Sequence, residues 1–90
     1  MTLQLEDSYS KFEEEKMLYF YLSLIDLLYG VDIRQLEDDI KIYEQIESYE
    51  ACAGIKEAVD VAQHKTFKEI KLIALEVQKK YNFDAVYDNN

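Results

Sequence analysis

Hydrophobic residues are concentrated in one stretch of the chain, residues 17–29. Eleven of these 13 residues are apolar or aromatic, and the two polar ones are Ser23 and Asp26. Wound as a helix at about 100° per residue, the stretch has two apolar faces, whereas an ordinary surface helix has one. The first face consists of Leu18, Leu22, Ile25 and Tyr29, and the second of Met17, Phe20, Leu24 and Leu27. We therefore expect this helix to be central and enclosed from two sides, by other helices of the chain or by a partner.

Capping signals set the expected ends of this first helix. Ser10 and Glu13 have the spacing of a capping box, in which each side chain bonds the backbone of the other residue. Gly30 suits the position that follows a helix, where the backbone turns left-handed. These signals predict a helix over residues 11–29. Residues 1–9 are expected to form an extended or frayed leader.

A second helix is predicted from the amphipathic pattern that follows. Asp32 suits the N-cap, with Gln35 as its reciprocal partner. The positions expected to face inward recur every three or four residues: Ile33, Leu36, Ile40, Tyr43 and Ile46. The opposite side holds mostly acids: Glu37, Asp38, Asp39, Lys41, Glu44, Glu47 and Glu50. We expect this side to be the strongest negative patch on the surface.

The boundary after the second helix has two interpretations. Either Ser48 caps a third helix, or the second helix continues to Ala53 and stops at Gly54. A third helix is then expected to cover residues 55–64. The small residues before and at Gly54 suit the close approach of two backbones.

The last helix has a clear start signal. Thr66 and Glu69 form a second capping box, which predicts a helix over residues 67–81. Residues 83–90 show no helical stripe and are expected to form a flexible tail. Three apolar residues of this tail are candidates for docking on the bundle: Phe83, Val86 and Tyr87.

The fold class follows from these patterns and from the scarcity of turn residues. The chain has no proline and only two glycines, so the many tight turns of an all-β fold are absent. We predict an all-α protein with a compact three- or four-helix antiparallel bundle around a central hydrophobic first helix. Residues 1–82 are expected to form a single domain.

The net charge of −9 narrows the classes of partner. Residues 1–50 contain 13 acids and 4 bases, while residues 51–90 contain 6 of each. An acidic surface disfavours nucleic acids and anionic membranes and favours basic partners. The apolar run of 13 residues is too short to cross a bilayer, which takes about 20. A single cysteine excludes an intramolecular disulfide, and we expect a cytoplasmic protein.

Candidate chemistry is sparse. Glu57, Asp60 and His64 share one helical face and are the best metal-ligand set, but one histidine at a solvated helix end is weak support. Cys52 and His64 are the only conceivable thiol pair, and Cys52 lies beside Glu50 among alanines, where a thiolate is not favoured. We therefore expect no enzyme, no cofactor and no metal site.

The function favoured by the sequence is protein binding. Eight tyrosines are more than a core of this size needs, and tyrosine is enriched at interfaces. We expect a protein that binds and restrains a basic partner, as an inhibitor, immunity protein, antitoxin or adaptor does. The predicted contact residues are Glu37, Asp38, Asp39, Glu44 and Glu47. A homodimer is also expected, through the face made of Met17, Phe20, Leu24 and Leu27, while the opposite face closes the bundle.

Three other functions stay open. The chain could be an assembly subunit that acts through homodimerisation of the first helix. Its carboxylates could imitate the phosphates of a nucleic acid and so occupy a nucleic-acid-binding protein. A metal or thiol enzyme that uses Cys52, Asp60 and His64 is the least favoured.

Overall fold

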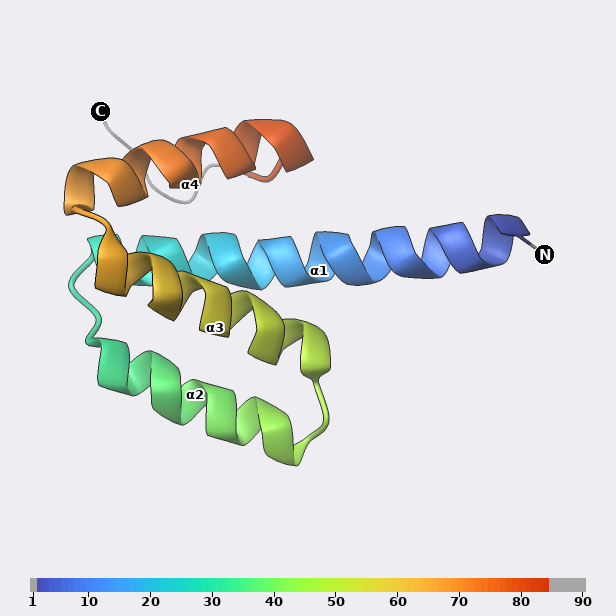
Figure 1. Cartoon of the computed structure of the whole chain (residues 1–90), viewed down its shortest axis with the longest axis horizontal. Coiled ribbons are helices and arrows are strands. Elements are labelled where there is room, and N and C mark those ends of the chain that lie inside the picture. Colours follow the sequence, from blue (N-terminus) through green and yellow to red (C-terminus); the bar gives the residue numbers. More distant parts are fainter. Residues whose placement is uncertain (1, 85–90) are drawn as a thin grey trace.

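Four α-helices make up the part of the chain that the structure describes. This computed structural model describes the backbone of residues 2–84 and the side chains of residues 11–84. The helices are α1 (Thr2–Leu28), α2 (Ile33–Gln45), α3 (Tyr49–His64) and α4 (Phe67–Tyr81), with no strand among the described residues. Successive helices run antiparallel (Figure 1). This arrangement confirms the predicted all-α antiparallel bundle.

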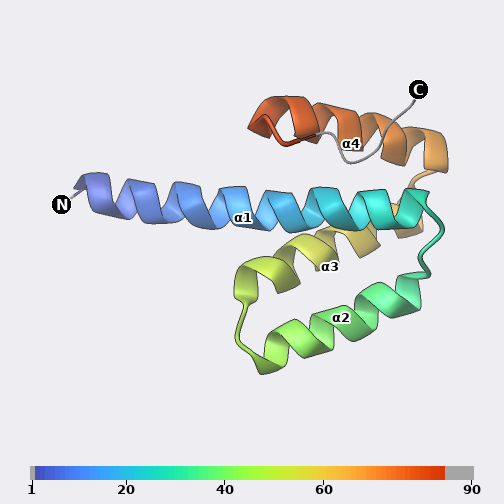
Figure 2. The same cartoon turned by 180° about the vertical axis from the view of Figure 1, so that it is seen from behind.

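Helix α1 is central, as predicted. Helix α3 packs on one side of α1 and α4 on another, while α2 packs mainly on α3 (Figures 1 and 2). Tyr21 and Leu24 of α1 are among the largest completely buried side chains. None of the helices, over the residues described, combines the length and hydrophobicity needed to cross a membrane.

Helix α1 begins earlier than predicted. It starts at Thr2, so Ser10 lies inside the helix and the predicted start at a Ser10 capping box is wrong. The amino-terminal half of α1 projects beyond the other helices (Figure 1). Residues 2–9 contain leucine, glutamine and glutamate, which are good helix formers, and no glycine or proline. Extending an existing helix costs far less than nucleating one, so these residues continue it.

The structure buries the second apolar face of α1 and leaves most of the first face exposed. Phe20, Leu24 and Leu27, which were expected to meet a second copy, are at most 6% exposed within the single chain, and Met17 packs against the same core. Of the first face, Leu18 and Leu22 are each 37% exposed and Tyr29 is 64% exposed, whereas Ile25 is buried at 3%. Self-association through Phe20 would therefore require the bundle to open. The oligomeric state itself stays a prediction.

Gly54 explains why the second face of α1 is the buried one. It lies in the middle of α3, directly against the backbone of α1. A Cβ at this position would stand 2.8 Å from the amide nitrogen of Phe20, 2.9 Å from the Cβ of Tyr19 and in collision with the carbonyl oxygen of Lys16. Only glycine allows this approach, which confirms the predicted close contact of two backbones.

The helix boundaries confirm some capping predictions and correct others. Helix α3 begins at Tyr49, after Ser48, as in the first of the two alternatives, so the predicted start at residue 55 is wrong. The Ser48 hydroxyl donates to Glu50 and makes no capping bond. Asp32 caps α2 by accepting from the Arg34 amide, but its expected partner Gln35 bonds Asp39 instead. The capping box of Thr66 and Glu69 at the start of α4 is complete, as predicted.

Three helices end in the same left-handed turn. After α1, the residue with positive φ is Gly30 (φ 95°), as predicted; after α4 it is Asn82 (φ 56°). After α2 it is Glu47 (φ 59°), whose amide bonds the Glu44 carbonyl while the next amide bonds the Tyr43 carbonyl. This hydrogen-bond pattern is a Schellman motif, in which glycine is the preferred residue.

The first residues of the predicted tail pack on the bundle. Phe83 stacks on Tyr81, with ring centroids 5.5 Å apart, and its ring also lies 5.8 Å from that of Tyr21. The docking predicted for Phe83 is therefore confirmed. The same prediction for Val86 and Tyr87 lies outside the described residues.

Candidate protein-binding face

The packing of α2 on α3 divides the predicted acidic side into two flanks. Leu36 and Ile40 are buried beneath α2. Glu37 and Glu44 lie seven residues apart on the flank that faces α3. Asp38 follows the buried Leu36 by two residues and so points about 200° away from it, to the solvent side of α2 that borders the other flank.

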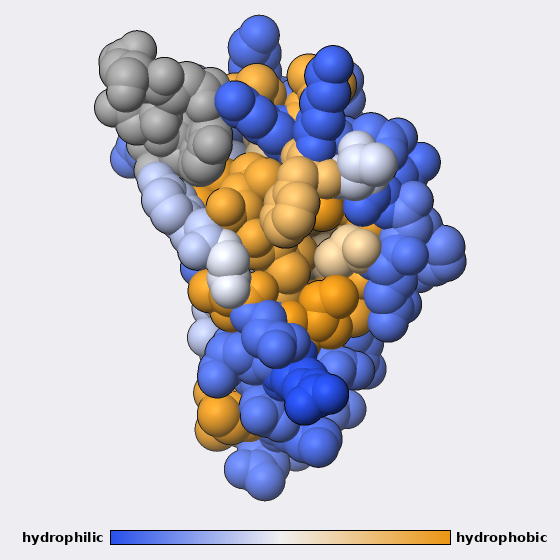
Figure 3. Space-filling view, turned by 90° about the vertical axis from the view of Figure 1, so that its left-hand side faces the viewer, coloured by the Kyte–Doolittle hydropathy of each residue, from blue (hydrophilic) through white to orange (hydrophobic). Residues whose placement is uncertain are grey.

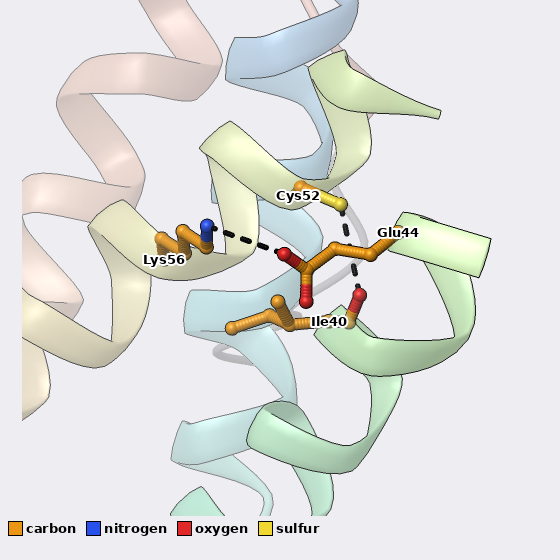
Figure 4. A network of polar contacts seen from close by, with 4 residues as sticks. All are labelled: Ile40, Glu44, Cys52 and Lys56. Atoms are coloured by element: carbon orange, nitrogen blue, oxygen red, sulfur yellow. Dashed lines mark hydrogen bonds and ion pairs between the residues drawn. The ribbon is translucent and has the colours of Figure 1, made fainter. Parts of the chain in front are cut away.

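On the flank that faces α3, the negative charges of the acids are balanced by nearby lysines. Its carboxylates and two lysines line one groove of about 330 Å³, together with Ile40 and Val59. The Lys56 ammonium lies 3.8 Å from the Glu44 carboxylate (Figure 4). Lys41 enters the same groove from one turn beyond Glu37. Two acids therefore face two bases here, and the flank has little excess charge to offer a partner.

Cys52 lies beneath this flank as a structural residue. Its thiol is 5% exposed and its Sγ lies 3.6 Å from the Ile40 carbonyl oxygen, to which it donates (Figure 4). The bond links α3 to α2. A thiol in this position is closed to substrate in the folded protein.

The other flank of α2 lies beside α1, where two carboxylates come together. Partial burial raises the pKa of the Asp26 carboxyl above its usual value, and the negative charge of Asp39 raises it further. Asp39 accepts a hydrogen bond of 3.1 Å from Gln35, a neutral group that leaves its charge in place. Asp39 of α2 is therefore near enough to Asp26 of α1 for its charge to act on the Asp26 carboxyl.

Tyr19 and Tyr43 join α1 to α2 beside these acids. Their rings meet edge to face with centroids 5.5 Å apart. Burial raises the pKa of the Tyr19 hydroxyl, and Tyr43, Glu50 and Glu15 raise it further. The negative environment thus extends along the contact between the two helices.

Large apolar side chains are exposed among these acids. Ile42 is 56% and Ile46 is 67% exposed, one helical turn apart on the flank of Asp38 and Asp39. Ile46 was predicted to face inward, and that prediction is wrong because α2 ends at Gln45 and Ile46 lies beyond the part that packs on α3. The other predicted inward positions are buried or half-buried. We call the surface made of Asp26, Asp38, Asp39, Ile42 and Ile46 the α1–α2 face.

The five predicted contact residues are thus not a single patch. Asp38 and Asp39 belong to the α1–α2 face, Glu47 follows it at the end of α2, and Glu37 and Glu44 lie on the flank that faces α3. Sequence reasoning missed Asp26 as a member, because the effect of Asp39 on Asp26 arises only when α1 and α2 both pack on α3. The division of α2 into flanks could have been found from the angular positions of its residues.

The candidate metal ligands do not converge. Glu57 pairs with Lys16 of α1 at 3.2 Å. The Nδ1 of His64 lies 2.8 Å from the Asp60 carbonyl oxygen and 3.6 Å from the Asp60 carboxylate. Within residues 11–84, where side chains are described, no three histidine, cysteine or acidic residues are grouped to hold a metal ion.

Comparisons of the chain with family models, curated proteins and solved structures found no match.

Proposed function

We propose that this chain is a small acidic interaction protein whose α1–α2 face binds and restrains a basic protein partner, as an inhibitor, immunity protein, antitoxin or adaptor does. The observation that carries the proposal is the contrast between the two flanks of α2. Partial burial and the negative charge of Asp39 both raise the pKa of the Asp26 carboxyl on one flank, while the acids on the other flank of α2 face lysines.

A cation supplied by a partner would relieve this repulsion. A lysine or arginine placed between Asp26 and Asp39 would interact with both carboxylates and favour their charged forms. The exposed Ile42 and Ile46 would supply apolar area next to those ion pairs. An apolar centre with charged residues around it is the usual composition of a protein interface. The apolar centre also favours an ordinary protein interface over the alternative function, in which the acids imitate the phosphates of a nucleic acid.

Glu47 gives separate support. A glutamate in a left-handed turn is strained where glycine would be relaxed. Strained residues cluster at functional sites. Glu47 follows Ile46 directly, so its carboxylate extends the charge of the α1–α2 face at the end of α2.

The test compares two charge reversals on the same helix. The full chain is used to retain proteins from its native cell, and the retained protein is purified and titrated by calorimetry. Asp38→Lys with Asp39→Lys is expected to weaken the complex about 100-fold or more, whereas Glu37→Lys with Glu44→Lys changes it less than about threefold. Circular dichroism confirms that both variants are folded. Equal losses, or a larger loss from the Glu37 and Glu44 variant, would contradict the proposal.

A further inference from the structure

A second surface lies at the end of the molecule where α1 connects to α2 and α3 connects to α4. An apolar hollow of about 330 Å³ opens there, above the buried side chains of Leu27 and Ile70. Its sides are formed by Ala62, Val31, Ile33 and Phe67. Figure 3 shows this end as an apolar area surrounded by hydrophilic residues.

An exposed aromatic ring stands beside the hollow. Phe67 is the first residue of α4 and is 67% exposed. The complete capping box of Thr66 and Glu69 fixes the helix start, and so fixes the position from which this ring projects. A phenylalanine can bury more than about 150 Å² on contact. The surface therefore carries an exposed phenyl ring, and beside it a hollow wide enough for a phenyl ring to enter.

The charge at this end differs from that of the rest of the chain. The connections and the first turns of α2 and α4 carry two acids, Asp32 and Glu69. They carry three bases, Arg34, Lys65 and Lys68. With Asp26 in the last turn of α1, which ends here as well, acids and bases number three each, so this end has no acidic excess to oppose self-association. Asp32 and Lys65 both line the hollow, one from each connection.

We propose that a second copy of this chain docks on this surface in a two-fold dimer, with Phe67 of each copy in the hollow of the other. A two-fold axis that passes between the two connections brings Asp32 of each copy toward Lys65 of its partner. The same patch then serves both copies, which is the requirement of a closed two-fold interface. The proposal uses no residue of the α1–α2 face and does not depend on its function.

The test measures the mass of the full chain in solution by sedimentation equilibrium, up to high micromolar concentration. The wild type is expected to form a dimer. Phe67→Asp, which adds a charge to the ring position, and Ala62→Leu, which fills the hollow, should each raise the dissociation constant about tenfold or more. The matched control is Leu72→Asp, because Leu72 lies on the same helix, is 54% exposed and does not line the hollow.

Two further measurements separate a direct effect from loss of structure. Circular dichroism and the melting temperature show whether each variant is folded. Lys65→Glu should also weaken the dimer, because two acids would then meet across the axis, and high salt should reduce the difference from wild type. A wild type that stays monomeric, or a dimer broken by Leu72→Asp and not by Phe67→Asp, would overturn the proposal.

Discussion

Gly54 of α3 lies so close to Phe20 of α1 that a Cβ added to the glycine would stand 2.8 Å from the Phe20 amide nitrogen. The neighbouring obstacles are also backbone or Cβ atoms, which cannot rotate away as the end of a long side chain does. The distance between α1 and α3 is therefore set by contact of main chains.

Gly54→Ala should strongly destabilise the protein. Alanine gains about 1 kcal/mol of helix propensity, but forcing the two main chains apart in a packed core costs more. We expect a net loss of about 2 kcal/mol or more in the free energy of unfolding, measured by urea denaturation. Gly30→Ala is the comparison, because its added Cβ would meet nothing within 4 Å and only the positive φ opposes it. A smaller loss at Gly54 than at Gly30 would contradict this account of the α1–α3 contact.

Glu47→Gly should stabilise the protein. The left-handed backbone after α2 favours glycine, and we expect a gain of about 0.5–1 kcal/mol, or a rise of about 2–6 °C in the melting temperature. Gln45→Gly is the matched control, since Gln45 is the last helical residue of α2 and glycine there should destabilise the helix. If the α1–α2 face binds a partner as proposed, the more stable Glu47→Gly protein should bind it less tightly.

Asp26→Asn should raise stability at neutral pH. The folded protein raises the pKa of Asp26, so the charged carboxylate is less favourable in the folded state than in the unfolded chain. Asp26 also lies in the last turn of α1, where the helix dipole disfavours a negative charge. The expected gain is only about 0.3 kcal/mol because the carboxylate is exposed to solvent.

The pH dependence of the stability difference between Asp26→Asn and wild type tests whether the gain comes from removing the Asp26 charge. The advantage of the asparagine variant should be complete above the folded pKa of Asp26 and should vanish as the pH falls through that pKa to below the ordinary value of 3.8. Melting temperatures of both proteins across this range measure it. An advantage that persists in acid would mean that the amide makes a new contact.

Cys52 should report the separation of α2 from α3. Its thiol is buried and bonded to α2, so a thiol reagent can reach it only when the two helices part. Labelling of the native protein should be slower than labelling of the urea-unfolded chain by a factor of about 100 or more. Similar rates in the two states would show that this contact opens readily.

The sequence predicted best what depends on neighbouring residues. The start of α4 follows from Thr66 and Glu69, and the turn after α1 from Gly30, because these residues bond the backbone next to them. Amphipathic spacing likewise placed Leu36 and Ile40 in the core. These signals act within one or two helical turns and need no knowledge of tertiary packing.

The wrong predictions concern contacts between distant segments. Both sides of α1 are apolar, so its own pattern did not decide which side faces water. Gly54, more than thirty residues later, decides it by admitting the backbone of α1 at Phe20. The closeness of Asp26 and Asp39 has the same origin, since neither residue carries a local signal of the other. The early start of α1 has a different reason, because the helix propensity of residues 2–9 outweighs the local capping signal at Ser10.

The projecting half of α1 holds the amino terminus far from the end of the molecule where α4 begins. Twenty-seven helical residues span about 40 Å, and the start of α1 at Thr2 lies at the opposite end of the molecule from Phe67. Fluorophores attached near the amino termini of two copies joined at their Phe67 ends would stand up to about 80 Å apart, beyond efficient energy transfer. Copies joined side by side in parallel would bring the same fluorophores close together. Because α1 is long, one measured distance between the fluorophores therefore distinguishes the two arrangements of a dimer.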